Sequence, residues 1–85
     1  VSVLFDITTN PNDLQDVASE IYKSEQVQRI FEKGGSSQLL VHALFNDLPE
    51  MQSFIENKLY KTKGIIQVMP SLILKRHKYD PSLSV

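Results

Sequence analysis

Hydrophobic and polar positions alternate along three stretches of the chain, and a fourth stretch is apolar on both sides. Residues 1–8, 24–33 and 37–45 follow the two-residue period of β-strands. Residues 64–75 also predict a strand, but with two apolar faces. One face is expected to carry Ile65, Met69 and Ile73, and the other Ile66, Val68, Leu72 and Leu74. A chain of 85 residues is too short to cover both faces, so we expect a partner to cover one.

Helical spacing separates these strands at two places. After the first strand, Asn10 can cap a helix that has Pro11 in its first turn. The apolar stripe of this helix consists of Leu14, Val17, Ala18, Ile21 and Tyr22. Before the second helix, Asp47 with Glu50 three residues later resembles a capping box, although Asn46 could be the cap instead. The apolar side of the second helix, which ends before Gly64, consists of Leu48, Met51, Phe54, Ile55 and Leu59.

The order βαββαβ predicts an α+β ferredoxin-like sandwich. In this fold an antiparallel four-stranded sheet has the strand order 4-1-3-2, and both helices cover one face. Pro70 fits the resulting edge position of the last strand, because its missing N–H then removes no ladder bond. The other sheet face stays open, and apolar groups there predict a partner surface.

The composition removes several kinds of site. The absence of cysteine excludes disulfides, thiolate metal sites and cysteine nucleophiles. His42 and His77 have no third ligand at a suitable spacing, so we expect no metal and no cofactor. No catalytic triad order, P-loop or dinucleotide motif is present, so we predict no catalysis. Helix-dipole and solvent-face charge explains the acidic residues of the two helices, Asp13, Asp16, Glu20, Glu50 and Glu56.

The charge and hydropathy of the chain predict a soluble cytoplasmic protein that does not itself contact nucleic acid. The net charge is −1, and one short basic run, residues 75–78, ends the last predicted strand. No apolar run approaches the roughly 20 residues of a membrane span, and no secretory leader opens the chain.

The joint spacing of these features resembles the RAM domain, the effector-binding domain of Lrp/AsnC transcriptional regulators. The matching features are the Pro-containing turn, the glycine hairpin, the Asp-led helix with Phe54 and Leu59, Gly64-Ile65, and an apolar strand ending at Lys75. The resemblance implies a domain over residues 1–78 and a tail over 79–85. It also implies dimers that pair through their open sheet faces and can form tetramers or octamers.

The resemblance further implies a ligand, usually an amino acid, between dimers, and DNA binding through an upstream helix-turn-helix. This chain would then be a stand-alone domain or the C-terminal part of a regulator. The implied dimer contacts are Leu4, His42, Leu72 and Leu74. The implied ligand contacts are Gly34, Gly35, Ser36, Ser37, Gln38, Val68 and Pro70.

The sequence departs from the family pattern at two of these places. Gln38 stands where the family commonly has an aspartate, so neutral hydrogen bonds replace a possible ion pair. Val68 to Ser71 stand where the family often has threonines. Residues 34–37 could hold a carboxylate through backbone N–H groups or form a plain hairpin turn. His42 could be a pH-sensitive contact or an ordinary hydrogen-bonded residue of an interface.

Three other interpretations share this topology. An ACT-like module also binds amino acids at subunit contacts and usually accompanies an enzyme. A small dimeric αβ-barrel enzyme would need polar residues around one cavity, and the candidates are His42, Tyr22 and Tyr60. An RNA-binding RRM would need exposed aromatic residues on its third strand, and residues 38–45 do not carry that pattern.

Overall fold

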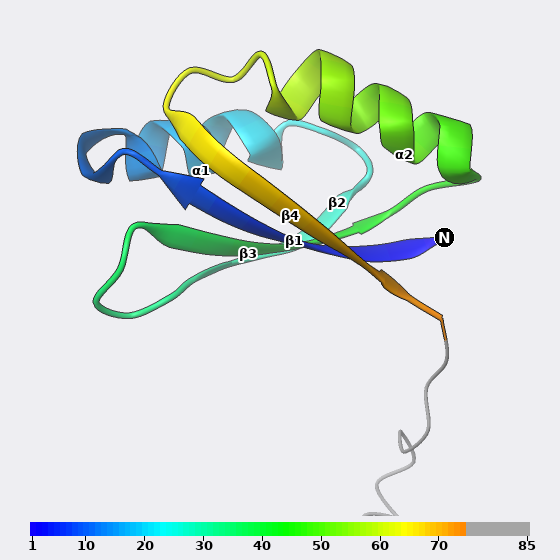
Figure 1. Cartoon of the computed structure of the whole chain (residues 1–85), viewed down its shortest axis with the longest axis horizontal. Helices are drawn as coiled ribbons and strands as arrows, with labels where there is room; N and C mark the ends of the chain where they lie inside the picture. The colour runs from blue at the N-terminus through cyan, green and yellow to red at the C-terminus, as the bar shows by residue number, and fades with distance from the viewer. Residues whose placement is uncertain (75–85) are drawn as a thin grey trace, which may run out of the picture.

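The computed structural model describes residues 1–74 as one antiparallel sheet with its helices on a single side (Figure 1). The strand order is β2-β3-β1-β4, which confirms the predicted order 4-1-3-2. The predicted domain boundary at residue 78 and the tail over 79–85 lie outside the described residues. The elements are β1 (Ser2–Thr9), α1 (Leu14–Tyr22), β2 (Val27–Glu32), β3 (Gln38–Leu44), α2 (Leu48–Phe54), a π-helical turn η2 (Ile55–Leu59) and β4 (Ile65–Ile73).

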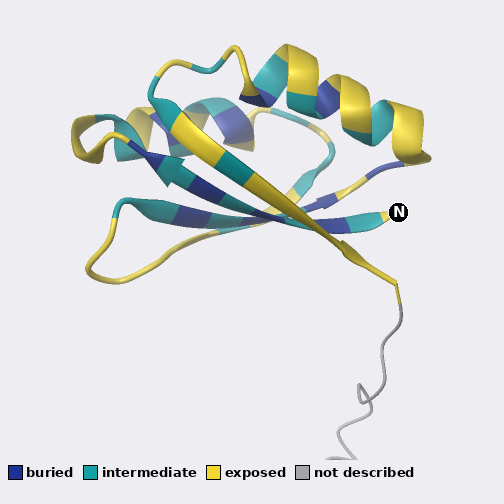
Figure 2. Cartoon of the chain, viewed as in Figure 1, coloured by how far each residue is buried: buried dark blue, intermediate teal, exposed yellow. Residues whose placement is uncertain are grey.

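The hydrophobic core lies between the sheet and the helices (Figure 2). Alternate residues of β1, namely Val3, Phe5 and Ile7, have no exposed surface, because their side chains face the helices. Phe5 packs against the rings of Phe45 and Phe54, with ring centroids 6.2 and 5.8 Å away. The other core residues are Val17, Ile21, Leu39, Val41, Ala43 and Leu59.

The two helices begin in different ways. At α2, the Glu50 backbone N–H donates to Asp47 Oδ1 at 2.9 Å, so Asp47 is the cap. The Glu50 carboxylate accepts from the Asn46 backbone N–H at 2.7 Å, one residue before the usual capping-box partner.

The prediction for α1 was wrong in two details. The side chain of Asn10 makes no capping bond, and Pro11–Asp13 form a 3-10 turn before the helix. Tyr22 ends the helix 77% exposed, outside the apolar stripe.

A bulge in β2 changes which residues face the helices. The pairing with β3 shifts between Val27 and Arg29, so Val27 and Ile30 both lie opposite core residues. Strict alternation predicted that Val27 and Phe31 share a face. Phe31 is instead 52% exposed and lies opposite Leu40, on the uncovered side of the sheet.

The register of β4 corrects the predicted orientation of its apolar residues. Leu72 lies opposite the core residue Val3, so it belongs to the helix-covered side and not to the open side. Leu74 follows the last residue of β4 and is 88% exposed. Within residues 1–74, β1 is the one strand paired with β4, which confirms the edge position predicted for Pro70.

Candidate functional site

The candidate site is the open face, which we define as the side of the sheet that carries no helix. Antiparallel pairing aligns its side chains in rows across the strands. Gln38, Thr8 and Gln67 form a polar row at the end near the β2–β3 hairpin. Farther along, six apolar side chains lie among the polar residues Ser2, Asp6, Arg29, His42 and Ser71. These apolar residues are Leu4, Phe31, Leu40, Leu44, Met69 and Ile73.

Direct contacts order the polar end of the open face. Gln38 Nε2 lies 3.5 Å from Thr8 Oγ1, a long hydrogen bond between β3 and β1. Lys33 Nζ lies 2.9 Å from Asp6 Oδ2 with both side chains partly exposed, so this ion pair contributes little to stability. The ion pair places the Asp6 carboxylate and the Lys33 ammonium at the same end of the sheet as the Gln38 amide and the Thr8 hydroxyl.

The hairpin beside this polar row is held to the sheet by its backbone. The Thr9 N–H donates to the Ser37 carbonyl at 2.8 Å, and the Lys33 N–H donates to the Gln38 carbonyl at 3.0 Å. Gly35 has φ +74°, a left-handed conformation that favours glycine. Ser36 Oγ donates to the Lys33 carbonyl at 3.4 Å. These contacts account for a β-hairpin turn, and the anion-binding interpretation remains a prediction.

The structure does not bring all the predicted ligand residues together in one chain. Gln38 lies on the open face, whereas Val68 and Pro70 lie opposite Ile7 and Phe5 on the helix-covered side. Sequence reasoning missed Thr8 and Gln67, which lie in line with Gln38. The alternation of β1 already placed Thr8 with Leu4, but finding Gln67 required the register of β4.

Two predicted dimer contacts lie next to each other on the open face. Leu4 and His42 are paired across β1 and β3, and both are half-buried. His42 Nε2 lies 2.8 Å from Ser2 Oγ, and Arg29 is its neighbour on β2. His42 therefore has a hydrogen-bond partner within its own chain.

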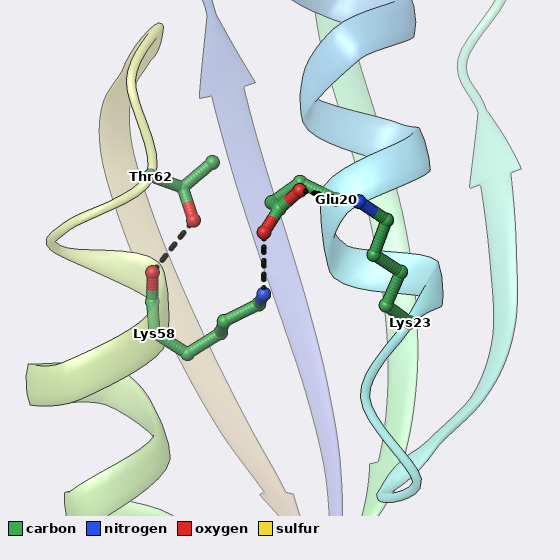
Figure 3. A network of polar contacts seen from close by, with 4 residues as sticks. All are labelled: Glu20, Lys23, Lys58 and Thr62. Carbon is green, nitrogen blue, oxygen red and sulfur yellow. Dashed lines mark hydrogen bonds and ion pairs between the residues drawn. The ribbon is translucent and has the colours of Figure 1, made fainter.

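A second polar cluster lies on the helical side and joins α1 to η2 (Figure 3). Glu20 accepts from Lys58 Nζ at 3.0 Å and from Lys23 Nζ at 3.1 Å. The hydrogen bond from Lys58, followed by that from Lys23, lowers the pKa of Glu20. Thr62 Oγ1 donates to the Lys58 carbonyl at 2.6 Å. Since the members of this cluster contact one another, its evident role is to stabilise the packing of α1 against η2.

The groups proposed for an αβ-barrel active site do not meet. His42 lies on the open face, while Tyr22 ends α1 and Tyr60 follows η2 on the helical side. Both tyrosines are largely exposed. Within residues 1–74, no three histidine or acidic side chains are grouped as a metal site would require. The helices of this part of the chain are also too short or too polar to cross a membrane.

A ferredoxin-like sandwich with one sheet face that no helix of residues 1–74 covers defines the structural class. The chain matches the family model of the Lrp/AsnC ligand binding domain over residues 2–83. It therefore belongs to this family.

Related proteins support this assignment. The HTH-type transcriptional regulator LrpA of Pyrococcus abyssi is 28% identical over 72 residues, which cover 85% of this chain and 51% of that protein. This chain thus spans about half the length of the curated relatives that it matches.

Two solved structures share the fold. The transcriptional regulator NMB0573 of Neisseria meningitidis, solved as an L-Met complex, has a TM-score of 0.82 and 22% identity, covering 95% of this chain and 54% of that one. TTHA0845 of Thermus thermophilus has a TM-score of 0.83 and 15% identity, covering 92% of this chain and 98% of that one.

Proposed function

We propose that this domain senses an amino acid and controls the assembly of a transcription regulator in the cytoplasm. A second copy packs on the open face, and the ligand binds where two such dimers meet. DNA binding belongs to a separate helix-turn-helix domain. The observation that carries the proposal is the open face itself, because a sheet side with this many exposed or half-buried apolar residues is typical of a partner surface.

The polar end of the open face supports the ligand-binding part of the proposal. Gln38, Thr8 and Gln67 offer amide and hydroxyl groups, which can donate and accept hydrogen bonds. Asp6 lies on the same face of β1 as Thr8, two residues away, and its carboxylate, which contacts Lys33, can also attract the ammonium group of an amino acid. The L-Met complex of NMB0573 supports amino acids as the class to test.

The remaining predicted contacts fit a ligand that lies between copies. Val68 and Pro70 face away from Gln38 within one chain, so one copy could supply the hairpin residues Gly34 to Gln38 and another could supply β4. Leu72 and Leu74 lie at the end of β4 and stay predicted interface residues, although Leu72 does not share the open face with Leu4.

The assembly part is tested by light scattering on variants of matched exposure. Phe31 on the open face and Leu48 on α2 are both 52% exposed. Phe31→Glu places a charge in the proposed interface and should lower the particle mass to that of a monomer. Leu48→Glu should leave the mass unchanged. A native mass for Phe31→Glu together with Met69→Glu would overturn the open-face dimer.

The ligand part is tested by thermal shift and calorimetry with the standard amino acids at millimolar concentration. Gln38→Ala should reduce the ligand-dependent rise in Tm without changing the Tm of the ligand-free protein. Gln52→Ala on α2 is the control. If no amino acid gives heat or a shift, the domain is a constitutive assembly module and the sensing part of the proposal is wrong.

A further inference from the structure

A groove of about 520 Å³ lies on the helical side of the sheet, between α1 and the edge strand β2. It is remote from the open face and has no part in the function proposed above. Its floor and walls are mostly apolar, and a charged side chain stands at each end. The apolar residues are Ala18, Tyr22, Ile30 and Leu39, and the charged ones are Glu32 and Lys23.

The two charged ends of the groove are too far apart for a single amino acid. Gln15 Nε2 donates to Glu32 Oε1 at 2.6 Å, so the acidic end lies beside the first turn of α1. Lys23 directly follows the last residue of the helix, eight residues after Gln15. At about 1.5 Å per residue, the two ends are separated by about 12 Å along α1. An extended peptide covers this distance with about four residues.

The edge of β2 offers backbone groups to such a peptide. The Lys33 N–H donates to the Gln38 carbonyl, so Lys33 turns its backbone groups toward β3. In an antiparallel ladder the alternate residues, Glu32 and Ile30, then turn theirs away from β3. In the described part of the chain β3 is the single strand paired with β2, so this edge is open. Ile30 and Glu32 are also the β2 residues whose side chains line the groove.

We propose that the β2 edge and this groove bind an extended peptide of a partner protein that adds to the sheet antiparallel to β2. Backbone hydrogen bonds to Ile30 and Glu32 provide the pairing, and alternate side chains enter the groove. In this direction the groove-facing residues of the peptide are, from its N-terminus, a basic residue beside Glu32, an apolar residue over Ile30 and Tyr22, and an acidic residue near Lys23, whose exposed ammonium it shares with Glu20. The bulge before Arg29 limits the ladder to the hairpin half of β2.

A fluorescein-labelled Ser-Lys-Thr-Leu-Thr-Glu-Ser peptide is the probe, and polarisation is measured on the whole chain. The control peptide, Ser-Glu-Thr-Leu-Thr-Lys-Ser, has the same composition with the charges exchanged. We expect the first peptide to bind about fivefold more tightly than the second, since an exposed ion pair contributes up to about that factor and the exchange removes the pairs at both ends. Equal affinities for the two peptides would overturn the proposed orientation and charge recognition.

Three changes test the parts of the proposal separately. Glu32→Lys should abolish the preference between the two peptides, because each of them then meets one opposite charge and one like charge. N-methylation of the peptide leucine should weaken binding by about tenfold or more, because it removes the donor to the Ile30 carbonyl and adds bulk at the edge. Tyr22→Ala should weaken binding, whereas Tyr60→Ala, which changes an exposed tyrosine outside the groove, should not.

Circular dichroism of each variant checks whether the fold is kept, and Tyr22 is exposed enough for its loss to be tolerated. The proposal is wrong if peptide binding is unchanged by Glu32→Lys, by Tyr22→Ala and by N-methylation.

A second copy of this chain is the other possible occupant of the edge. If Glu32→Lys alters the oligomer mass and the peptide does not bind, the edge joins copies and the peptide proposal is wrong. Neither result bears on the proposed dimer through the open face, which is tested separately with Phe31→Glu.

Discussion

The covered face and the open face of β1 come from alternate residues of one strand, yet their surroundings differ. Val3, Phe5 and Ile7 are completely buried under the helices, whereas Leu4 and Asp6 between them are half-buried. Both sides carry apolar groups, but within residues 1–74 the helices cover one side only, and the proposed dimer would cover the other. Substitutions on the two faces should therefore separate folding from assembly.

Removal of a core ring should have the largest effect. Phe5→Ala deletes the ring that contacts Phe45 and Phe54, and such changes cost about 3–5 kcal/mol. A domain of this length has about 4–13 kcal/mol of stability, so the variant should lose a substantial part of it and unfold at a clearly lower urea concentration. Urea unfolding followed by circular dichroism measures this, and Phe5→Leu should give a smaller loss. A wild-type midpoint for Phe5→Ala would contradict the described core.

A truncation on the open face should act on assembly more than on folding. Full burial of a leucine side chain contributes about 1.5–3 kcal/mol, and a twofold interface contains each residue twice. Leu4→Ala should therefore weaken dimerisation by about tenfold or more, measured by analytical ultracentrifugation over a range of concentrations. The Tm of the variant should fall below that of wild type at concentrations at which wild type is a dimer, and the two Tm values should converge at concentrations at which both are monomers. If Leu4→Ala lowers Tm equally where both chains are monomers, Leu4 supports the monomer fold instead.

The same comparison shows what could be predicted from the sequence. The alternation of β1 and the order of elements were sufficient for the fold and for the open face, because each depends on local periodicity. The sequence pattern was not sufficient to assign the residues of β2 and β4 to the two sheet faces. A bulge in β2 puts Val27 and Phe31 on different faces, and the pairing with Val3 decides on which face Leu72 lies. The row of Gln38, Thr8 and Gln67 likewise depends on strand register, which no segment contains by itself.

The helix that closes the covered face should depend on its cap to an intermediate degree. Asp47→Ala removes the acceptor for the Glu50 N–H and should cost about 1 kcal/mol of stability in urea unfolding. Asn10→Ala is the matched control, because the Asn10 side chain makes no capping bond. Equal losses for the two variants would show that the cap of α2 has no special importance.

The smallest effect is expected for Glu20→Gln, which weakens the contact between the helical segments above the covered face. Because Lys58 and Lys23 lower the pKa of Glu20 below its ordinary value of 4.5, the ionised carboxylate favours the folded state. Its contribution should be complete above the ordinary pKa and disappear as the pH falls through the lowered folded value. The Tm difference between wild type and variant should thus be constant near neutral pH, shrink in salt and vanish in acid. Glu56→Gln, whose carboxylate contacts Gln52 and no lysine within residues 1–74, should show no such pH dependence. A wild-type advantage that persists after Glu20 is protonated would mean that packing, and not charge, joins α1 to η2.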